Sequence, residues 1–346
     1  MRRCLILLVF LTFLPLRVCA MDYTAPTVPE NAEIYMPENT QSFAEGFWEV
    51  LSNALQMLDP PFMEAVEICS KLLAATLLIT LVSNIRGTPS RTAEFVGALC
   101  VAVLLITPSN SLISLGADTV RQMSDYGKLL LPVMTAAMAA QGGVTASTAL
   151  YAGTAMFDAI LSGIISAVTV PLLYIYLALI VAHAAIGEDI LKRISDLVRW
   201  FCTWVLKTLL YIFTGYIGLT GVISGTTDAA AMKVAKMTIS GAVPVVGGIL
   251  SDASEAILVS VGVMKNAAGI YGIFAVLAIF AGPFLRIGVH YLMLKLTAAV
   301  SSVYAPKRVT ELIGQMSSAM GMLLGMTGAV CVMLMISTVC YMRGVG

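Results

Sequence analysis

Charged side chains are scarce in this sequence of 346 residues. They make up 12% of it, whereas soluble domains carry roughly 25%. Hydrophobic residues account for 59%, and the mean hydropathy is +0.91. The 20 basic and 20 acidic residues give a net charge of zero. The chain therefore has no overall positive charge that would attract nucleic acid or an anionic surface. This composition argues against nucleic-acid binding and predicts a protein embedded in the lipid bilayer.

Signatures of soluble enzymes are also missing. There is no Gly-rich loop ending in Gly-Lys-Ser/Thr, no HExxH and no nucleophile elbow, and the only histidines are His183 and His290. No convincing catalytic pair stands out in an apolar stretch either. We therefore expect no enzymatic activity, no cofactor and no metal. If a complex containing this chain consumes ATP, another subunit should hydrolyse it.

The seven cysteines show neither paired spacing nor the clustering that zinc or iron–sulfur ligation needs. Most of them lie in or beside apolar stretches, where cysteine serves as a small apolar side chain. We therefore predict no disulfide framework. The cysteines are Cys4, Cys19, Cys69, Cys100, Cys202, Cys331 and Cys340.

The N-terminus has the pattern of a signal peptide. Two arginines precede an apolar run at 4–16, and residues 18–20 are small enough for a signal peptidase. We predict cleavage after Ala20, giving a signal peptide at 1–20. A lipoprotein acylated on Cys19 is the rival, although the preceding valine is large for that motif. A second alternative is that the segment stays attached as a membrane anchor, although its apolar run of 13 residues is short for a membrane span.

Signal-led export places the next segment, 21–62, outside the cytoplasm. It is richer in Pro, Asn, Glu and Thr, and it is too short to form a core of its own. Its aromatic residues near 43–48 suit the membrane interface. Two transmembrane helices are then predicted within 63–127, separated by a loop that contains Arg86 and Arg91. Because basic loops stay inside, this loop should be cytoplasmic.

The remainder contains an internal repeat. Pro132 and Pro171 are 39 residues apart, and so are Pro244 and Pro283. Each pair is followed by a similar basic octet, LKRISDLV at 191–198 and PKRVTELI at 306–313, whose apolar spacing is typical of an amphipathic interfacial helix. We predict an all-α polytopic membrane protein of roughly seven to ten segments, with two repeated units at about 128–222 and 241–342 and with helices broken at prolines.

The relative orientation of the two units depends on their first segments, 129–150 and 241–262. If both segments cross the bilayer, the units are parallel and the stretch 191–199 is cytoplasmic. If both only dip in, the units are inverted, and Lys233 and Lys236 are cytoplasmic instead. We favour the parallel arrangement.

Ionisable residues in apolar stretches are candidate polar linings or ion sites, because they are expensive to place in a membrane. The alternative is a loop or interfacial helix at 251–256 whose acids lie in water. Glycine pairs beside the prolines are candidate helix breaks, where freed backbone groups can coordinate a solute. The lining candidates are Asp158, Asp252, Glu255, Lys265 and Arg286, and the break candidates are Pro132, Gly142, Gly143, Pro171, Pro244, Gly247, Gly248 and Pro283.

Three stretches, at 130–147, 231–257 and 264–287, together resemble the stage III sporulation protein AE family, and the resemblance runs over about residues 60–342. It implies a multi-pass protein of the mother-cell membrane around the forespore, with an extracytoplasmic mature N-terminus. The implied partners are other stage III sporulation membrane proteins and a forespore-side complex, with an ATPase subunit as a further candidate.

The implied role is part of a channel that sustains the forespore and its late gene expression. No catalytic residues are implied, and the N-terminal region is short for the family. The competing hypothesis is a stand-alone secondary transporter whose duplicated units alternate access. Such a transporter should bind a solute in isolation and depend sharply on buried charges such as Asp158.

Overall fold

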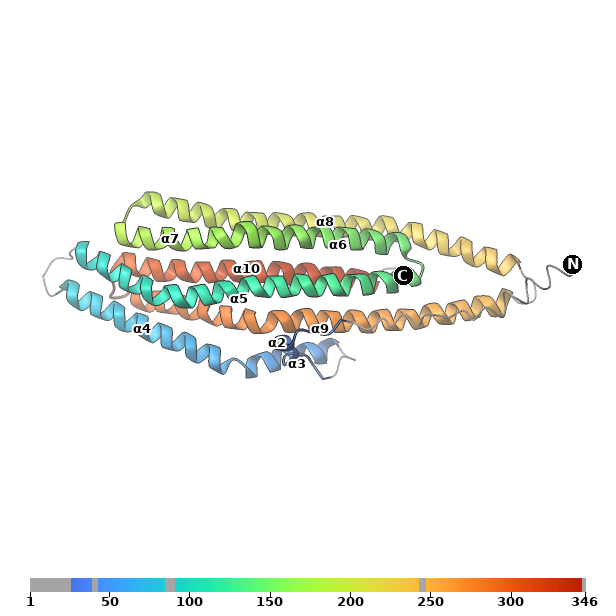
Figure 1. Ribbon diagram of the computed structural model, residues 1–346, viewed down its shortest axis with the longest axis horizontal. Coiled ribbons are helices and arrows are strands. Elements are labelled where there is room, and N and C mark those ends of the chain that lie inside the picture. The colour runs from blue at the N-terminus through green and yellow to red at the C-terminus, as the bar shows by residue number, and fades with distance from the viewer. Residues whose placement is uncertain (1–25, 39–42, 85–90, 243–246, 344–346) are drawn as a thin grey trace.

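The structure is a computed structural model that describes residues 26–38, 43–84, 91–242 and 247–343. Within these ranges, side chains are described except at 43, 84, 91–93, 220–242, 247–265 and 343. Helices account for nearly all of the described chain, which contains no strand (Figure 1). In order, the elements are α2 (Glu30–Glu33), α3 (Phe43–Gln56), α4 (Asp59–Asn84), α5 (Arg91–Ala140), α6 (Val144–Ile164), the π-helix η1 (Ile165–Thr169), α7 (Val170–Ile186), α8 (Asp189–Ala242), α9 (Gly247–Ser301) and α10 (Lys307–Arg343).

Six helical stretches of the described chain are long and apolar enough to cross a membrane. This confirms the all-α polytopic class. The sequence suggested seven to ten segments because it treats each apolar run separately, whereas in the structure such runs join into continuous helices. The span in α5, for example, has 47 residues, against the roughly 20 that a bilayer needs. The six stretches are Asp59–Ser83, Glu94–Ala140, Val144–Ile186, Asp189–Leu219, Asn266–Ser301 and Lys307–Met342.

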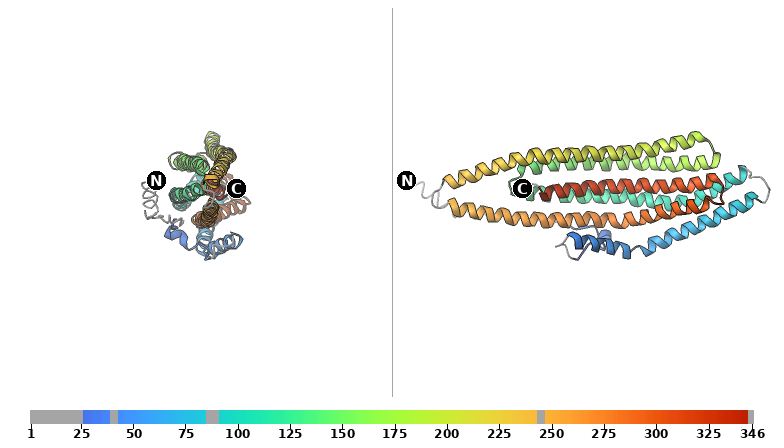
Figure 2. Two further views of the ribbon diagram at one scale, coloured as in Figure 1. Left: turned by 90° about the vertical axis from the view of Figure 1, so that its right-hand side faces the viewer. Right: turned by 180° about the vertical axis from the view of Figure 1, so that it is seen from behind.

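The long helices form a bundle along one axis (Figures 1 and 2). α6, η1 and α7 form one continuous path, and the direction alternates from α4 to α5, to this path, to α8, to α9 and to α10. One end of the bundle holds the end of α4, the start of α5 and the turns α7–α8 and α9–α10. The other end holds the α5–α6 turn, and α8 and α9 continue beyond it as a pair (Figure 1). The hairpins α7–α8 and α9–α10 therefore point the same way. Their two basic octets lie at the same end, which we call the octet end.

Helix α10 lies at the centre of the bundle. In its most apolar stretch 61% of residues are buried, compared with 22% in α4 and in α8. Leu312, Met316 and Leu323 are fully buried. Glycine permits close packing here, since a Cβ on Gly116 of α5 would lie 3.0 Å from the Leu323 side chain.

The predicted break residues differ in their placement. Gly142 has φ +94°, and Gly143 is the N-cap of α6, so this pair forms the turn between α5 and α6, where a left-handed conformation favours glycine. Pro132 and Pro283 lie inside α5 and α9, which continue through them without a helix break.

Pro171 follows the π-helix η1, where the Val170 N–H donates to the Ile165 carbonyl. Proline has no N–H to donate, so a local wide turn accommodates it within a continuous helical path. Pro244 lies outside the described residues, and Gly247 and Gly248 begin α9.

Candidate functional site

Asp158 is a buried carboxyl group in α6, and only 3% of the residue is exposed. The Ser124 hydroxyl of α5 donates a 2.6 Å hydrogen bond to its Oδ2, while Oδ1 has no hydrogen-bond partner in the described part of the chain. One turn earlier on α6, the Thr154 hydroxyl lies 3.1 Å from the Ser337 hydroxyl of α10. These two hydrogen bonds form a short row of buried polar groups between α5, α6 and α10.

Arg286 lies on a different interface, between α9 and α4. Its Nη2 donates to Glu64 Oε2 at 2.8 Å, and both side chains are partly exposed. One turn later, His290 Nδ1 lies 2.8 Å from the Arg286 carbonyl oxygen. The Arg286–Glu64 ion pair joins α9 to α4. Among the described residues, no hydrogen bond or ion pair connects it to Asp158.

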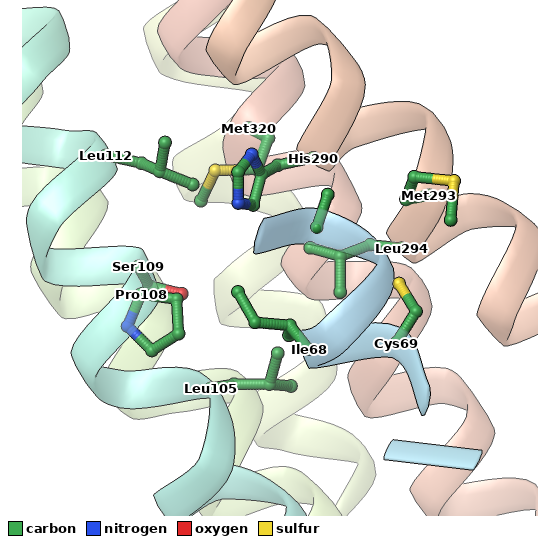
Figure 3. A pocket seen from close by; sticks show the side chains of 11 residues that line it. Ile68, Cys69, Leu105, Pro108, Ser109, Leu112, His290, Met293, Leu294 and Met320 are labelled. Carbon is green, nitrogen blue, oxygen red and sulfur yellow. The ribbon is translucent and has the colours of Figure 1, made fainter. Parts of the chain in front are cut away.

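A small pocket adjoins His290 (Figure 3). The imidazole lies across from Pro108, Ser109 and Leu112 of α5 in this view. The His290 Nε2 atom is buried and has no hydrogen-bond partner among the described residues. The pocket has a volume of about 10 Å³, so it has room for at most a single water molecule.

A third polar cluster occupies the octet end. Glu311 of α10 lies 3.6 Å from His183 Nε2, 3.3 Å from Lys192 Nζ and 4.0 Å from Lys307 Nζ. Next to it, Arg308 Nε lies 3.7 Å from Glu94 of α5. Ion pairs therefore join the starts of α5, α8 and α10.

This octet-end cluster was not among the sequence-predicted sites, although its signal was present. Lys192 belongs to the first octet and Glu311 to the second, so the two matching octets carry complementary charges that can pair once they lie side by side. Lys192 Nζ donates to Glu311 Oε1 across this contact. Sequence similarity identified the octets but did not indicate that they touch.

The described residues do not assemble the predicted lining into one site. Asp158 and Arg286 lie at separate interfaces. Asp252, Glu255 and Lys265 belong to α9, but their side chains lie outside the described residues. The lining therefore stays a prediction.

The histidines and cysteines are the remaining side chains that could carry chemistry in the described part of the chain. Within the described part, the Nδ1 atoms of His183 and His290 each donate to a backbone carbonyl oxygen, and no hydrogen bond joins either ring to a hydroxyl or thiol. The described residues contain no group of three His, Cys, Asp or Glu side chains that could hold a metal ion. All five described cysteines are free thiols, three of them buried.

Comparisons with known proteins agree on one family. The model of the family described as "Stage III sporulation protein AE" matches residues 34–344. A curated relative, stage III sporulation protein AE of Bacillus subtilis (strain 168), is 24% identical over 240 residues, which are 66% of this chain. The match spans 60% of that relative's length. No solved structure matches the chain.

Proposed function

Because this chain belongs to the stage III sporulation protein AE family, we propose that it is a non-enzymatic membrane component of the complex linking mother cell and forespore. In this role it maintains the forespore and supports late forespore gene expression. The main support for the proposal is that the family match and the membrane-spanning helices cover the same part of the chain. The family match covers residues 34–344, and the six apolar helices lie within the same residues.

The distribution of charge supports one orientation in the membrane. Arg91 and both basic octets belong to elements that start at the octet end, whereas the segment 21–62 contains seven acidic residues and no Lys or Arg. Basic residues are retained on the cytoplasmic side. We therefore assign the octet end to the cytoplasm and the mature N-terminus to the outside, which gives six spans and parallel hairpins.

This orientation places the paired extension of α8 and α9 on the extracytoplasmic side (Figures 1 and 2). In the mother-cell membrane around the forespore, that side is the intermembrane space. A forespore-side partner would therefore meet the chain at this extension, and mother-cell subunits would meet it at the octet end.

Deletion of the gene tests the proposal. Cells lacking it are induced to sporulate, and forespore size, a late forespore-specific reporter and vegetative growth are recorded. We expect collapsed forespores and a silent reporter with normal growth, all restored by a wild-type copy. Normal spores, or a nutrient-dependent growth defect, would contradict the proposal and favour the stand-alone transporter.

Asp158 distinguishes the two functions further, because its buried carboxyl is the observation that favours a transporter. In the Asp158→Asn variant, the side-chain amide oxygen can still accept the Ser124 hydrogen bond while the ionisable group is lost. We expect this variant to restore sporulation to about the wild-type level, since a scaffold needs the hydrogen bond and not the charge. Loss of sporulation with normal protein abundance would favour the transporter.

A further inference from the structure

A cavity of about 440 Å³ lies between α8, α9 and α10, and neither the family role nor the polar sites above account for it. Three basic residues line it and no acidic residue does: Arg199 and Lys207 from α8, and Lys295 from α9. Thr203, Tyr291 and Ser318 complete its polar side. A cavity of this size exceeds a water site and is typical of small-ligand pockets.

The three cations are incompletely neutralised by the protein. Arg199 pairs with Asp196 at 3.6 Å, on the exposed surface of the same helix. Lys295 Nζ donates to the Tyr291 hydroxyl at 3.2 Å and lies over its ring, which leaves its charge unpaired. Lys207 has no ion pair or hydrogen bond within the described part of the chain. A group with negative charge and several acceptor oxygens would complete this set.

Neighbouring aromatic residues place the cavity at a membrane interface. Trp200 and Trp204 stack on each other with ring centroids 6.0 Å apart, and both are at least half exposed. They lie next to the cavity-lining face of α8, directly after Arg199 and shortly before Lys207. Exposed tryptophans mark the headgroup level of a bilayer, and Lys207 lies about 12 Å deeper along the helix than Arg199.

We propose that this cavity binds the phosphate headgroup of an anionic phospholipid from the leaflet at the octet end. The cations would hold the phosphate oxygens, and the apolar residues between them would contact the start of the acyl chains. Basic pockets between transmembrane helices recognise lipid headgroups in this manner. The alternative for a lone lysine below the interface is to extend its side chain back to the headgroups. That alternative would not require three cations around one cavity.

Tryptophan fluorescence can test the site directly, because the chain has only three tryptophans. In a Trp48→Phe background, Trp200 and Trp204 report on the cavity. The purified protein is reconstituted in vesicles of phosphatidylcholine containing brominated phosphatidylglycerol, or in vesicles of phosphatidylglycerol containing brominated phosphatidylcholine. We expect the quenching curves to give a relative affinity about tenfold or more in favour of the anionic lipid. Each cation that binds the phosphate should raise this affinity about fivefold.

Two kinds of variant should abolish this preference by different routes. The triple variant R199Q/K207Q/K295Q removes the charges. Gly325→Leu keeps the charges but fills the cavity, since a Cβ on Gly325 meets nothing within 4 Å. The charge-preserving variant K207R/K295R should retain the preference. The control K71Q/R121Q/K128Q removes three exposed cations elsewhere, so it should retain the preference as well.

The outcomes separate the possible occupants. Equal quenching by both lipids, or an undiminished preference in the triple variant or in Gly325→Leu, would overturn the proposal. Relief of quenching by added inorganic phosphate would assign the cavity to a soluble anion and overturn the lipid assignment. Wild-type circular dichroism and gel filtration in each variant ensure that a lost preference reports the site and not a failure to fold.

Discussion

Helices α8 and α10 begin with matching basic octets and leave the same end of the bundle in the same direction, but they occupy opposite environments. Of their most apolar stretches, 61% is buried in α10 and 22% in α8. Helix α10 contacts α5, α6, α7, α8 and α9, whereas α8 presents Trp200, Trp204 and Tyr211 outward. Two helices that begin with a matching sequence pattern can therefore share a direction while only one of them forms the core.

The largest expected effect is a cavity in α10. Leu323 is fully buried in α10, whereas Leu219 of α8 is 68% exposed. We expect Leu323→Ala to lower the free energy of unfolding by about 2–5 kcal/mol, and Leu219→Ala by less than about 0.5 kcal/mol. Thermal or denaturant unfolding in detergent, followed by circular dichroism, measures both. Equal losses would mean that the two helices are equally packed.

An intermediate effect is expected where the two octets meet. Glu311 faces His183, Lys192 and Lys307. Among the described residues, its counterpart Asp196 forms an ion pair with Arg199 alone, on the exposed surface. Glu311→Gln should cost about 1–2 kcal/mol, because Lys192 and the buried His183 lose the carboxylate that they face. Asp196→Asn should cost less than about 0.5 kcal/mol. The same unfolding assay decides, and a larger cost for Asp196→Asn would contradict the described pairing.

The smallest effect concerns the turn that precedes α8. Gly187 ends α7 with φ +83°, and a Cβ there would collide with the Arg308 guanidinium. Gly187→Ala should therefore destabilise the protein by about 1 kcal/mol. The control is Gly215→Ala in α8, whose Cβ would meet nothing within 4 Å. It should be neutral or stabilising by up to about 1 kcal/mol. If both variants behave alike, the left-handed turn is absent.

Apolar runs predicted the membrane class because the bilayer requires long hydrophobic helices whatever their packing. The number of helices was less predictable. Pro108 and Pro132 both lie inside α5, since a long helix can tolerate proline when neighbours satisfy the freed backbone groups. Sequence patterns also could not pair Asp158 with Ser124, or Glu311 with Lys192, because these contacts depend on how each helix is rotated against its neighbours.

The orientation of the two octets is the central claim, and cysteine accessibility tests it most directly. In a cysteine-free background, single cysteines replace Glu188 and Val303 in the two octet-end turns, and Val144 at the opposite end. All three residues are exposed. The variants are produced in vegetative cells, where the extracytoplasmic face of the membrane meets the medium, and intact cells are then treated with a membrane-impermeant maleimide. We predict labelling at 144 only, with 188 and 303 labelled after permeabilisation. Labelling of 188 and 303 from opposite sides of the membrane would contradict the account.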